Sequence, residues 1–340
     1  MEKVVLAFSG GLDTSFCVPY LKNEKGLEVH TVLVNTGGFS SDEAKKIEER
    51  ALTLGAASHT TVDAVDTYYN KGLKYLIFGN VLKNNTYPLS VSSERVFQAL
   101  EVLNTVKKIG AKYVAHGSTG AGNDQVRFDI VFEIMAPEVE ILAPIRELEI
   151  SRKDEIEYLT RHGFNFSWEK SKYSINQGIW GTSIGGVETL SSSGYLPEEA
   201  YPSQKVKDGS EIVTLGFKKG ELCSVNGQEM NPVQAIYKLK EIAEPYGIGR
   251  DTHVGDTIIG IKGRVGFEAA APLIIIKAHH LLEKHVLTKN QLNWKDQLSN
   301  YYGQLMHEAQ YLEPLSRDIE AFLESTQGTV TGSVQVELRP

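Results

Sequence analysis

Short apolar runs alternate with stretches of helical periodicity along the first half of the chain. The apolar runs predict strands at residues 3–8, 28–34, 59–62, 113–116 and 140–143. The periodic stretches between and after them predict helices at residues 12–23, 41–54, 65–78, 91–109, 123–136 and 151–162, with Ser40 or Ser41 as a cap. This alternation is typical of an α/β fold in which helices cover both faces of a parallel sheet.

The pattern changes near residues 164–172, beyond which Gly, Ser and Pro become frequent. In this second half we expect a hairpin of two strands, 212–217 and 221–225, turning at Lys218-Lys219-Gly220. Helices are expected at 232–245 and 272–285, and a last strand at 329–338. We therefore predict two domains, residues 1–167 and an α+β domain at 168–340.

Composition narrows the class of protein. The 340 residues include 35 Lys+Arg and 43 Asp+Glu, for a net charge of −8, and no basic cluster. Such a chain is a poor candidate for binding a nucleic-acid duplex or an anionic membrane. Nothing in it approaches the ~20 apolar residues of a membrane span, and the N-terminus does not resemble a signal peptide. With only Cys17 and Cys223 as cysteines, we expect a soluble cytoplasmic protein.

A glycine-rich string, Ser9-Gly10-Gly11-Leu12-Asp13-Thr14-Ser15, falls between the first strand and the first helix. Its glycines allow a tight turn and a close approach to a ligand. Its hydroxyls and the free N–H groups of the helix start form a cradle for an anion. The plain alternative is a Gly-Gly turn with Asp13 in the first helical turn. The string fits neither GxxxxGK[ST] nor GxGxxG.

This string resembles the pyrophosphate loop of the ATP pyrophosphatases, which cleave ATP between its α- and β-phosphates and adenylate a substrate oxygen. The resemblance implies a HUP-type, Rossmann-like sheet of five parallel strands in the order 3-2-1-4-5. It identifies residues 1–167 as the nucleotide-binding domain. In that strand order, the loops after the first and fourth strands face each other at the switch point where ligands bind.

The loop after the fourth predicted strand reads HGSTGAGNDQVRF from His116 to Phe128. Asn123 and Arg127 are four apart and share a helix face, and Arg127 offers a planar fork of donors for a carboxylate. Thr119 and the loop amides add donors for anions. The plain alternative is a helix capped by Asn123. Opposite the first loop, the string favours ligand binding.

The second string is similar to HG-[AS]-TG-x-GNDQVRF of the argininosuccinate synthases, and the resemblance extends over most of the chain, including residues 140–146 and YGIGR at 246–250. It implies condensation of citrulline and aspartate with ATP to give argininosuccinate, AMP and pyrophosphate. We expect Mg²⁺ to accompany the nucleotide, as in phosphoryl-transfer sites generally. It also implies a homo-oligomer, a tetramer in the family. We expect the family's C-terminal extension, used in tetramer formation, to be missing here.

The resemblance assigns roles to matching residues. Its catalytic positions are Asp13, Asp124 and Arg127. Its ATP contacts fall on Ala7, Phe8, Ser9, Gly10, Gly11, Leu12, Asp13, Thr14, Ser15, Val34 and Gly117. Its aspartate contacts fall on Thr119, Asn123 and Asp124, and its citrulline contacts on Tyr87, Ser92, Asn123, Arg127, Ser174 and Ser183. Arg95 also matches the family, without an assigned partner.

Two positions depart from the family. Gly255 and Phe267 stand where it has a Glu and a Tyr beside the α-amino end of citrulline. These changes predict a wider, more apolar site that could accept an α-N-acylated citrulline. The alternative is that Asp256 or Glu268 takes over the contact with the free ammonium.

Other functions stay open as alternatives. A tRNA thiolase of this class would need catalytic cysteines and a basic face, and an amidotransferase synthetase would need an ammonia source. A non-catalytic ATP-binding module is also compatible with the first loop. His279 and Glu283, four apart on a predicted helix, lack an evident third metal ligand. We expect a packed or solvated helix there and no metal site.

Overall fold

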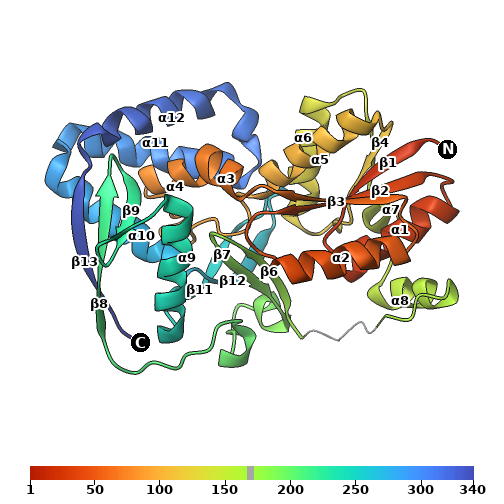
Figure 1. Ribbon diagram of the computed structural model, residues 1–340, viewed down its shortest axis with the longest axis horizontal. Coiled ribbons are helices and arrows are strands. Elements are labelled where there is room, and N and C mark those ends of the chain that lie inside the picture. The colour runs from red at the N-terminus through yellow and green to blue at the C-terminus, as the bar shows by residue number, and fades with distance from the viewer. Residues whose placement is uncertain (167–171) are drawn as a thin grey trace. The chain divides into compact units, whose positions relative to one another are not determined.

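The computed structural model describes residues 1–166 and 172–340. The chain divides into two units, unit 1 with residues 1–64 and 95–171 and unit 2 with residues 65–94 and 172–340 (Figure 1). The domain boundary predicted between residues 167 and 168 lies outside the described residues. Residues 65–94, placed in the first domain by the sequence, group with unit 2.

Unit 1 is built on a five-stranded parallel sheet. Its strands are β1 (Lys3–Ala7), β2 (Glu28–Asn35), β3 (Ser58–Asp63), β4 (Tyr113–Ala115) and β5 (Glu140–Leu142). Their order is β3-β2-β1-β4-β5, and every neighbouring pair is parallel. The predicted α/β fold and strand order are confirmed. Because the chain moves outward on one side through β2 and β3 and on the other through β4 and β5, the switch point lies between β1 and β4.

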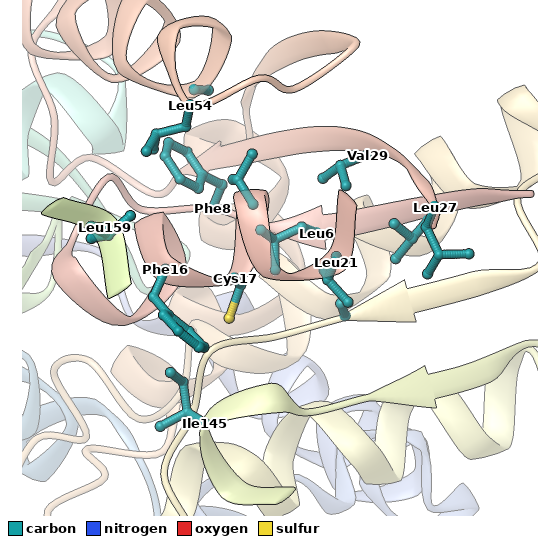
Figure 2. Packing of buried hydrophobic residues seen from close by; sticks show 14 of the residues in the cluster. Leu6, Phe8, Phe16, Cys17, Leu21, Leu27, Val29, Leu54, Ile145 and Leu159 are labelled. Carbon is teal, nitrogen blue, oxygen red and sulfur yellow. The ribbon is translucent and has the colours of Figure 1, made fainter. Parts of the chain in front are cut away.

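Helices cover both faces of this sheet (Figure 1). On one side lie α1 (Leu12–Asn23), α2 (Ser41–Thr53), α7 (Pro144–Leu148) and α8 (Arg152–Arg161), and on the other lie α5 (Arg95–Ile109) and α6 (Asn123–Met135). The core under α1 joins Leu6 and Phe8 of the first strand region to Phe16, Cys17 and Leu21 of the helix (Figure 2). Cys17 is fully buried and packs as a small apolar side chain.

Unit 2 contains two antiparallel sheets. One has the order β10-β9-β8-β13, with β8 (Glu211–Lys218), β9 (Glu221–Val225), β10 (Gln228–Glu229) and β13 (Gly332–Leu338). The other has the order β11-β12-β7-β6, with β6 (Ser174–Gly178), β7 (Gly181–Gly185), β11 (Arg250–Asp256) and β12 (Lys262–Glu268). The predicted hairpin is confirmed as β8–β9, and its turn places Lys219 and Gly220 at φ of 51° and 81°.

The helices of unit 2 include two that the sequence pattern did not predict, α11 (Lys289–His307) and α12 (Pro314–Thr326). The others are α3 (Val65–Tyr68), α4 (Lys74–Phe78), α9 (Pro232–Ala243) and α10 (Ala270–Val286). A π-helical turn at Tyr69–Leu73 interrupts the single helix predicted over 65–78. Short 3-10 turns occupy Val187–Leu190, Glu198–Ala200, Glu244–Tyr246, Gln310–Leu312 and Gln327–Thr329. Within residues 1–166 and 172–340, no helix is long and apolar enough to cross a membrane.

A polar network is buried between α10, α11 and the end of α12. The Nζ of Lys295 lies 3.1 Å from Oε2 of Glu283, and both side chains are fully buried. The ring nitrogens of His279 lie 2.7 Å from Asn80 Oδ1 and 2.9 Å from Gln327 Oε1, and burial lowers the pKa of His279 to about 4. His279 and Glu283 thus belong to an internal network. The described residues contain no group of three His, Cys, Asp or Glu able to hold a metal ion.

We expect Glu283→Ala to destabilise unit 2 by about 3–5 kcal/mol, because it leaves the buried ammonium of Lys295 without its carboxylate. The thermal unfolding midpoint measures this. The control is Glu241→Ala, which removes an exposed ion pair with Lys238 and is expected to cost less than about 1 kcal/mol. Equal shifts for the two variants would contradict the prediction.

Candidate functional site

The two adjacent glycines of the loop after β1 have different roles. Gly10 has a φ of +75°, and a Cβ there would lie 3.0 Å from Cγ1 of Ile47. Gly11 has a φ of −70° and is the N-cap of α1. A Cβ on Gly11 would approach only Ser9 Oγ, at 3.5 Å, among non-adjacent residues of the described chain. The turn therefore requires glycine at position 10, while position 11 borders open space.

Polar groups gather at the start of α1 around this space. No side chain caps the helix within the described chain, so N–H groups of its first turn remain available for an anion. The hydroxyl oxygens of Ser9 and Thr14 lie 3.4 Å apart beside it. Arg50 of α2 donates a hydrogen bond to the carbonyl of Gly10 and brings a positive charge to the loop.

The other residues predicted to contact ATP differ in their position and burial. Ala7 ends β1, and Val34 lies on the neighbouring strand β2, so both belong to this end of the sheet. The side chains of Phe8 and Leu12 pack into the core, leaving the backbone as their contribution to any site. Ser15 is fully buried, and its hydroxyl has no hydrogen-bond partner among the described residues.

An ion-pair network shapes the loop after β4. The N–H of Ser118 donates to Nδ1 of His116 at 3.2 Å, so Nε2 carries the proton and donates to Asp129 Oδ1 at 3.0 Å. The other carboxylate oxygen of Asp129 pairs with Nη1 of Arg146 at 2.5 Å. Because Asp129 lies on α6 and Arg146 on α7, the network ties the loop to two helices.

The loops after β1 and β4 meet at the switch point. A Cβ on Gly117 would lie 3.0 Å from Cγ2 and 3.2 Å from the backbone N of Thr14, so the two backbones can approach only because position 117 is glycine. Helix α6 begins at Asn123 with Gly122 as its N-cap and no side-chain cap among the described residues. The alternative of a helix capped by Asn123 is therefore wrong. Two helices point uncapped N-termini at one edge of the sheet.

Asp124 lies between two arginines in the first turn of α6. Its carboxylate oxygens pair with Arg95 Nε at 2.9 Å and Arg127 Nη1 at 2.7 Å. Partial burial favours protonation of Asp124, but the positive charges of Arg95 and Arg127 outweigh it and hold its pKa well below the usual range. Asp124 therefore stays ionised at neutral pH. The resemblance gave Arg95 no assigned partner, and the structure shows that its partner is Asp124.

A second group of predicted residues lies in unit 2. The Tyr87 hydroxyl lies 3.4 Å from Oγ of Ser183 and accepts a hydrogen bond from Ser90 at 3.3 Å. The ring of Tyr87 stacks on His253, with centroids 5.0 Å apart. Ser174 is exposed on β6, and Ser92 is buried with no partner for its hydroxyl among the described residues. Of the predicted citrulline contacts in unit 2, Tyr87 and Ser183 are thus brought together.

The expectation of a wider site at Gly255 is wrong. A Cβ there would lie 2.7 Å from Nε2 of His253 and 3.2 Å from Nδ2 of Asn84, so both side chains already fill the space. Phe267 is fully buried, and its ring packs against that of Tyr87 with centroids 5.3 Å apart. Gly255 and Phe267 therefore both pack against a cluster formed by Tyr87 and His253, which leaves no extra space.

Neither carboxylate expected to replace the lost glutamate is free for that contact. Glu268 is buried, pairs with Arg250 Nε at 2.8 Å and accepts hydrogen bonds from the backbone N–H and hydroxyl of Ser203. Asp256 is exposed and pairs with Lys262 at 2.7 Å. Glu268 thus positions Arg250 and the segment around Ser203.

Comparison with known proteins places this geometry in a family. Residues 3–165 match the family model described as arginosuccinate synthase N-terminal HUP domain, and residues 173–339 match the arginosuccinate synthase C-terminal domain. The chain belongs to the argininosuccinate synthase family. The argininosuccinate synthase of Methanocaldococcus jannaschii is 40% identical, over 99% of this chain and 86% of the relative.

Other argininosuccinate synthases are similar to the same extent. That of Xanthomonas campestris pv. campestris is 39% identical, over 99% of this chain and 86% of its own. That of Pyrococcus furiosus is 39% identical, over 99% and 82%. The family resemblance inferred from the two loop strings is thus confirmed across both units.

The adjacent glycines of the first loop give a matched pair of variants. We expect Gly11→Val to abolish pyrophosphate binding while the thermal unfolding midpoint stays unchanged, because its side chain enters the space at the helix start. We expect Gly10→Val to lower that midpoint, because a β-branched residue resists a φ of +75° and would collide with Ile47. Calorimetric titration measures the binding. Unchanged pyrophosphate affinity in Gly11→Val would show that the anion binds elsewhere.

Proposed function

We propose that this protein is a ligase that joins citrulline to aspartate at the expense of ATP, giving argininosuccinate, AMP and pyrophosphate, in arginine biosynthesis. The observation that carries the proposal is the pair of uncapped helix N-termini, of α1 and α6, that meet where β1 and β4 end. One can hold an inorganic leaving group and the other a carboxylate substrate. Membership in the argininosuccinate synthase family supports the same activity.

In this proposal the first loop binds the ATP phosphates. The backbone of residues 7–15 and the hydroxyls of Ser9 and Thr14 would surround the β- and γ-phosphates, and Val34 and Gly117 would border the rest of the nucleotide. The N–H groups at the start of α1 stabilise the charge on the departing pyrophosphate. Mg²⁺ would come with the nucleotide and neutralise its phosphates. The open space above Gly11 fits such a group.

Aspartate would bind around the second loop, and both amino-acid substrates keep the contacts expected from the resemblance. Thr119, Asn123 and Asp124 would hold aspartate, and Tyr87, Ser92, Asn123, Arg127, Ser174 and Ser183 would contact citrulline. Asp124 is supported in this role because it stays ionised between Arg95 and Arg127 and can only accept hydrogen bonds from an amine. Since His253 fills the space at Gly255, free citrulline is preferred here over an N-acylated one.

The chemistry has two steps. The ureido oxygen of citrulline attacks the α-phosphorus of ATP, an O–P bond forms, and the bond to the β-phosphate oxygen breaks to release pyrophosphate. The aspartate amine then attacks the ureido carbon, loses a proton, and displaces AMP. Both steps rest on positioning and charge stabilisation, with no covalent bond to the protein. We further propose a cytoplasmic enzyme that forms a homo-oligomer, as expected from the resemblance.

Pyrophosphate release tests the proposed function. We expect release from ATP only when citrulline and aspartate are both present, with argininosuccinate formed in equal amount. A non-catalytic ATP-binding module would bind ATP without any release. Release that does not require citrulline would indicate another adenylating enzyme and would overturn the proposal.

We expect Asp124→Ala to reduce argininosuccinate formation by at least about 10³-fold while ATP affinity changes little, because the variant removes the acceptor for the substrate amine. Steady-state kinetics and calorimetry measure the two effects.

Asp124→Asn is the companion variant. Its amide oxygen can still bond Arg95 or Arg127, so the local structure is kept while the charge is lost. We expect the same loss of activity in both variants. Turnover near the parent level in Asp124→Asn would contradict a role for the carboxylate charge.

A further inference from the structure

A buried glutamate lies beneath the loop after β1. Helix α8 packs on α1 in unit 1, and Glu155 of its first turn is only 3% exposed. Its Oε2 has no hydrogen-bond partner among the described residues. A buried carboxylate normally requires a cation or several donors. Glu155 is unusual because one of its neighbours is a second carboxyl group.

That neighbour is Asp13, the acidic residue of the SGGLDTS string. The carboxyl group of Glu155 faces that of Asp13 within hydrogen-bonding reach. Ionised carboxylates only accept hydrogen bonds, so such a bond exists only while one of the two groups carries a proton. The geometry therefore makes Asp13 and Glu155 a pair that shares one proton.

The surroundings assign that proton to Glu155. Burial and then the charge of Asp13 raise the pKa of Glu155 to about 8, and burial also raises the pKa of Asp13. Arg152 of α8 faces both groups and opposes the shifts. Cys17, one turn along α1, has a thiol whose pKa is raised by burial, with Asp13, Glu155 and Glu147 of α7 adding to the shift, so it stays neutral. At neutral pH the pair holds one negative charge.

We propose that Glu155 is a positioning residue for the ligase reaction, whose protonated carboxyl donates to Asp13, fixes the Asp13 carboxylate at the start of α1, and keeps the pair at a single negative charge beneath the phosphate loop. This rests on the proposed function of that loop. A second carboxylate charge there would repel both ATP and the pyrophosphate that leaves it. Loss of the shared proton should therefore weaken binding of both anions.

The test follows ATP-dependent turnover and pyrophosphate binding between about pH 7 and pH 9, in the full-length parent and three variants. Across that range the protonated fraction of Glu155 falls about tenfold. We expect two quantities of the parent to fall by a similar factor, the kcat/KM for ATP and the affinity for pyrophosphate. Glu155→Gln keeps a donor that cannot ionise, so its profile should be flat. Glu155→Ala lacks the donor, so its turnover should be lower than that of Glu155→Gln throughout.

Glu157→Gln is the matched control, because Glu157 lies on the same helix but is exposed and paired with Arg161. We expect it to keep the alkaline loss of the parent. A parent profile that is flat above pH 8, or an unchanged alkaline loss in Glu155→Gln, would overturn the proposal. The calorimetric arm requires no turnover. It therefore separates this proposal from the proposed function, which fails if both amino acids are present and no pyrophosphate is released.

Discussion

The site depends on one constraint, that β1 and β4 are neighbours in a parallel sheet and end at the same edge. In the strand order β3-β2-β1-β4-β5 this edge is the switch point, where ligands bind in such sheets. There Gly117 lets one loop touch Thr14 at the start of α1. Both following helices have a glycine as N-cap, and their first N–H groups are left for a ligand. A bound anion would accept hydrogen bonds from these N–H groups.

The concentration of carboxylates at this edge has to be neutralised, and the chain does so in three different ways. Asp124 lies between Arg95 and Arg127, which keep it ionised. Asp129 lies between His116 and Arg146, which hold the second loop in shape. Asp13 faces a second carboxyl group as well as Arg152, so the charge of the carboxyl pair depends on a proton.

Unit 1 could be predicted from the sequence because its strands are apolar and its helices are periodic. The helix predicted over residues 12–23 matches α1. Unit 2 was harder because β6, β7, β11 and β12 are rich in polar residues and glycine, and their pairing decides their structure. Helix α11 carries a capping box at Thr288 that could have revealed its start.

In the candidate site, too, local features could be predicted from the sequence and long-range contacts could not. The two loop strings predicted the glycine turn after β1 and the helices that follow both loops, since these are local features. The partner of Arg95, the pairing of Glu155 with Asp13, and the filling of the space at Gly255 by His253 all join segments distant in sequence. Local pattern carries no information about such contacts, and only the folded chain supplies it.

In the proposed reaction the ureido oxygen of citrulline attacks ATP and leaves with AMP. Incubation of the protein with ATP, aspartate and citrulline labelled with ¹⁸O at the ureido position tests it directly by mass spectrometry of the AMP formed. The account predicts one labelled oxygen in each AMP, formed together with argininosuccinate. AMP that carries no label, alongside argininosuccinate, would contradict it.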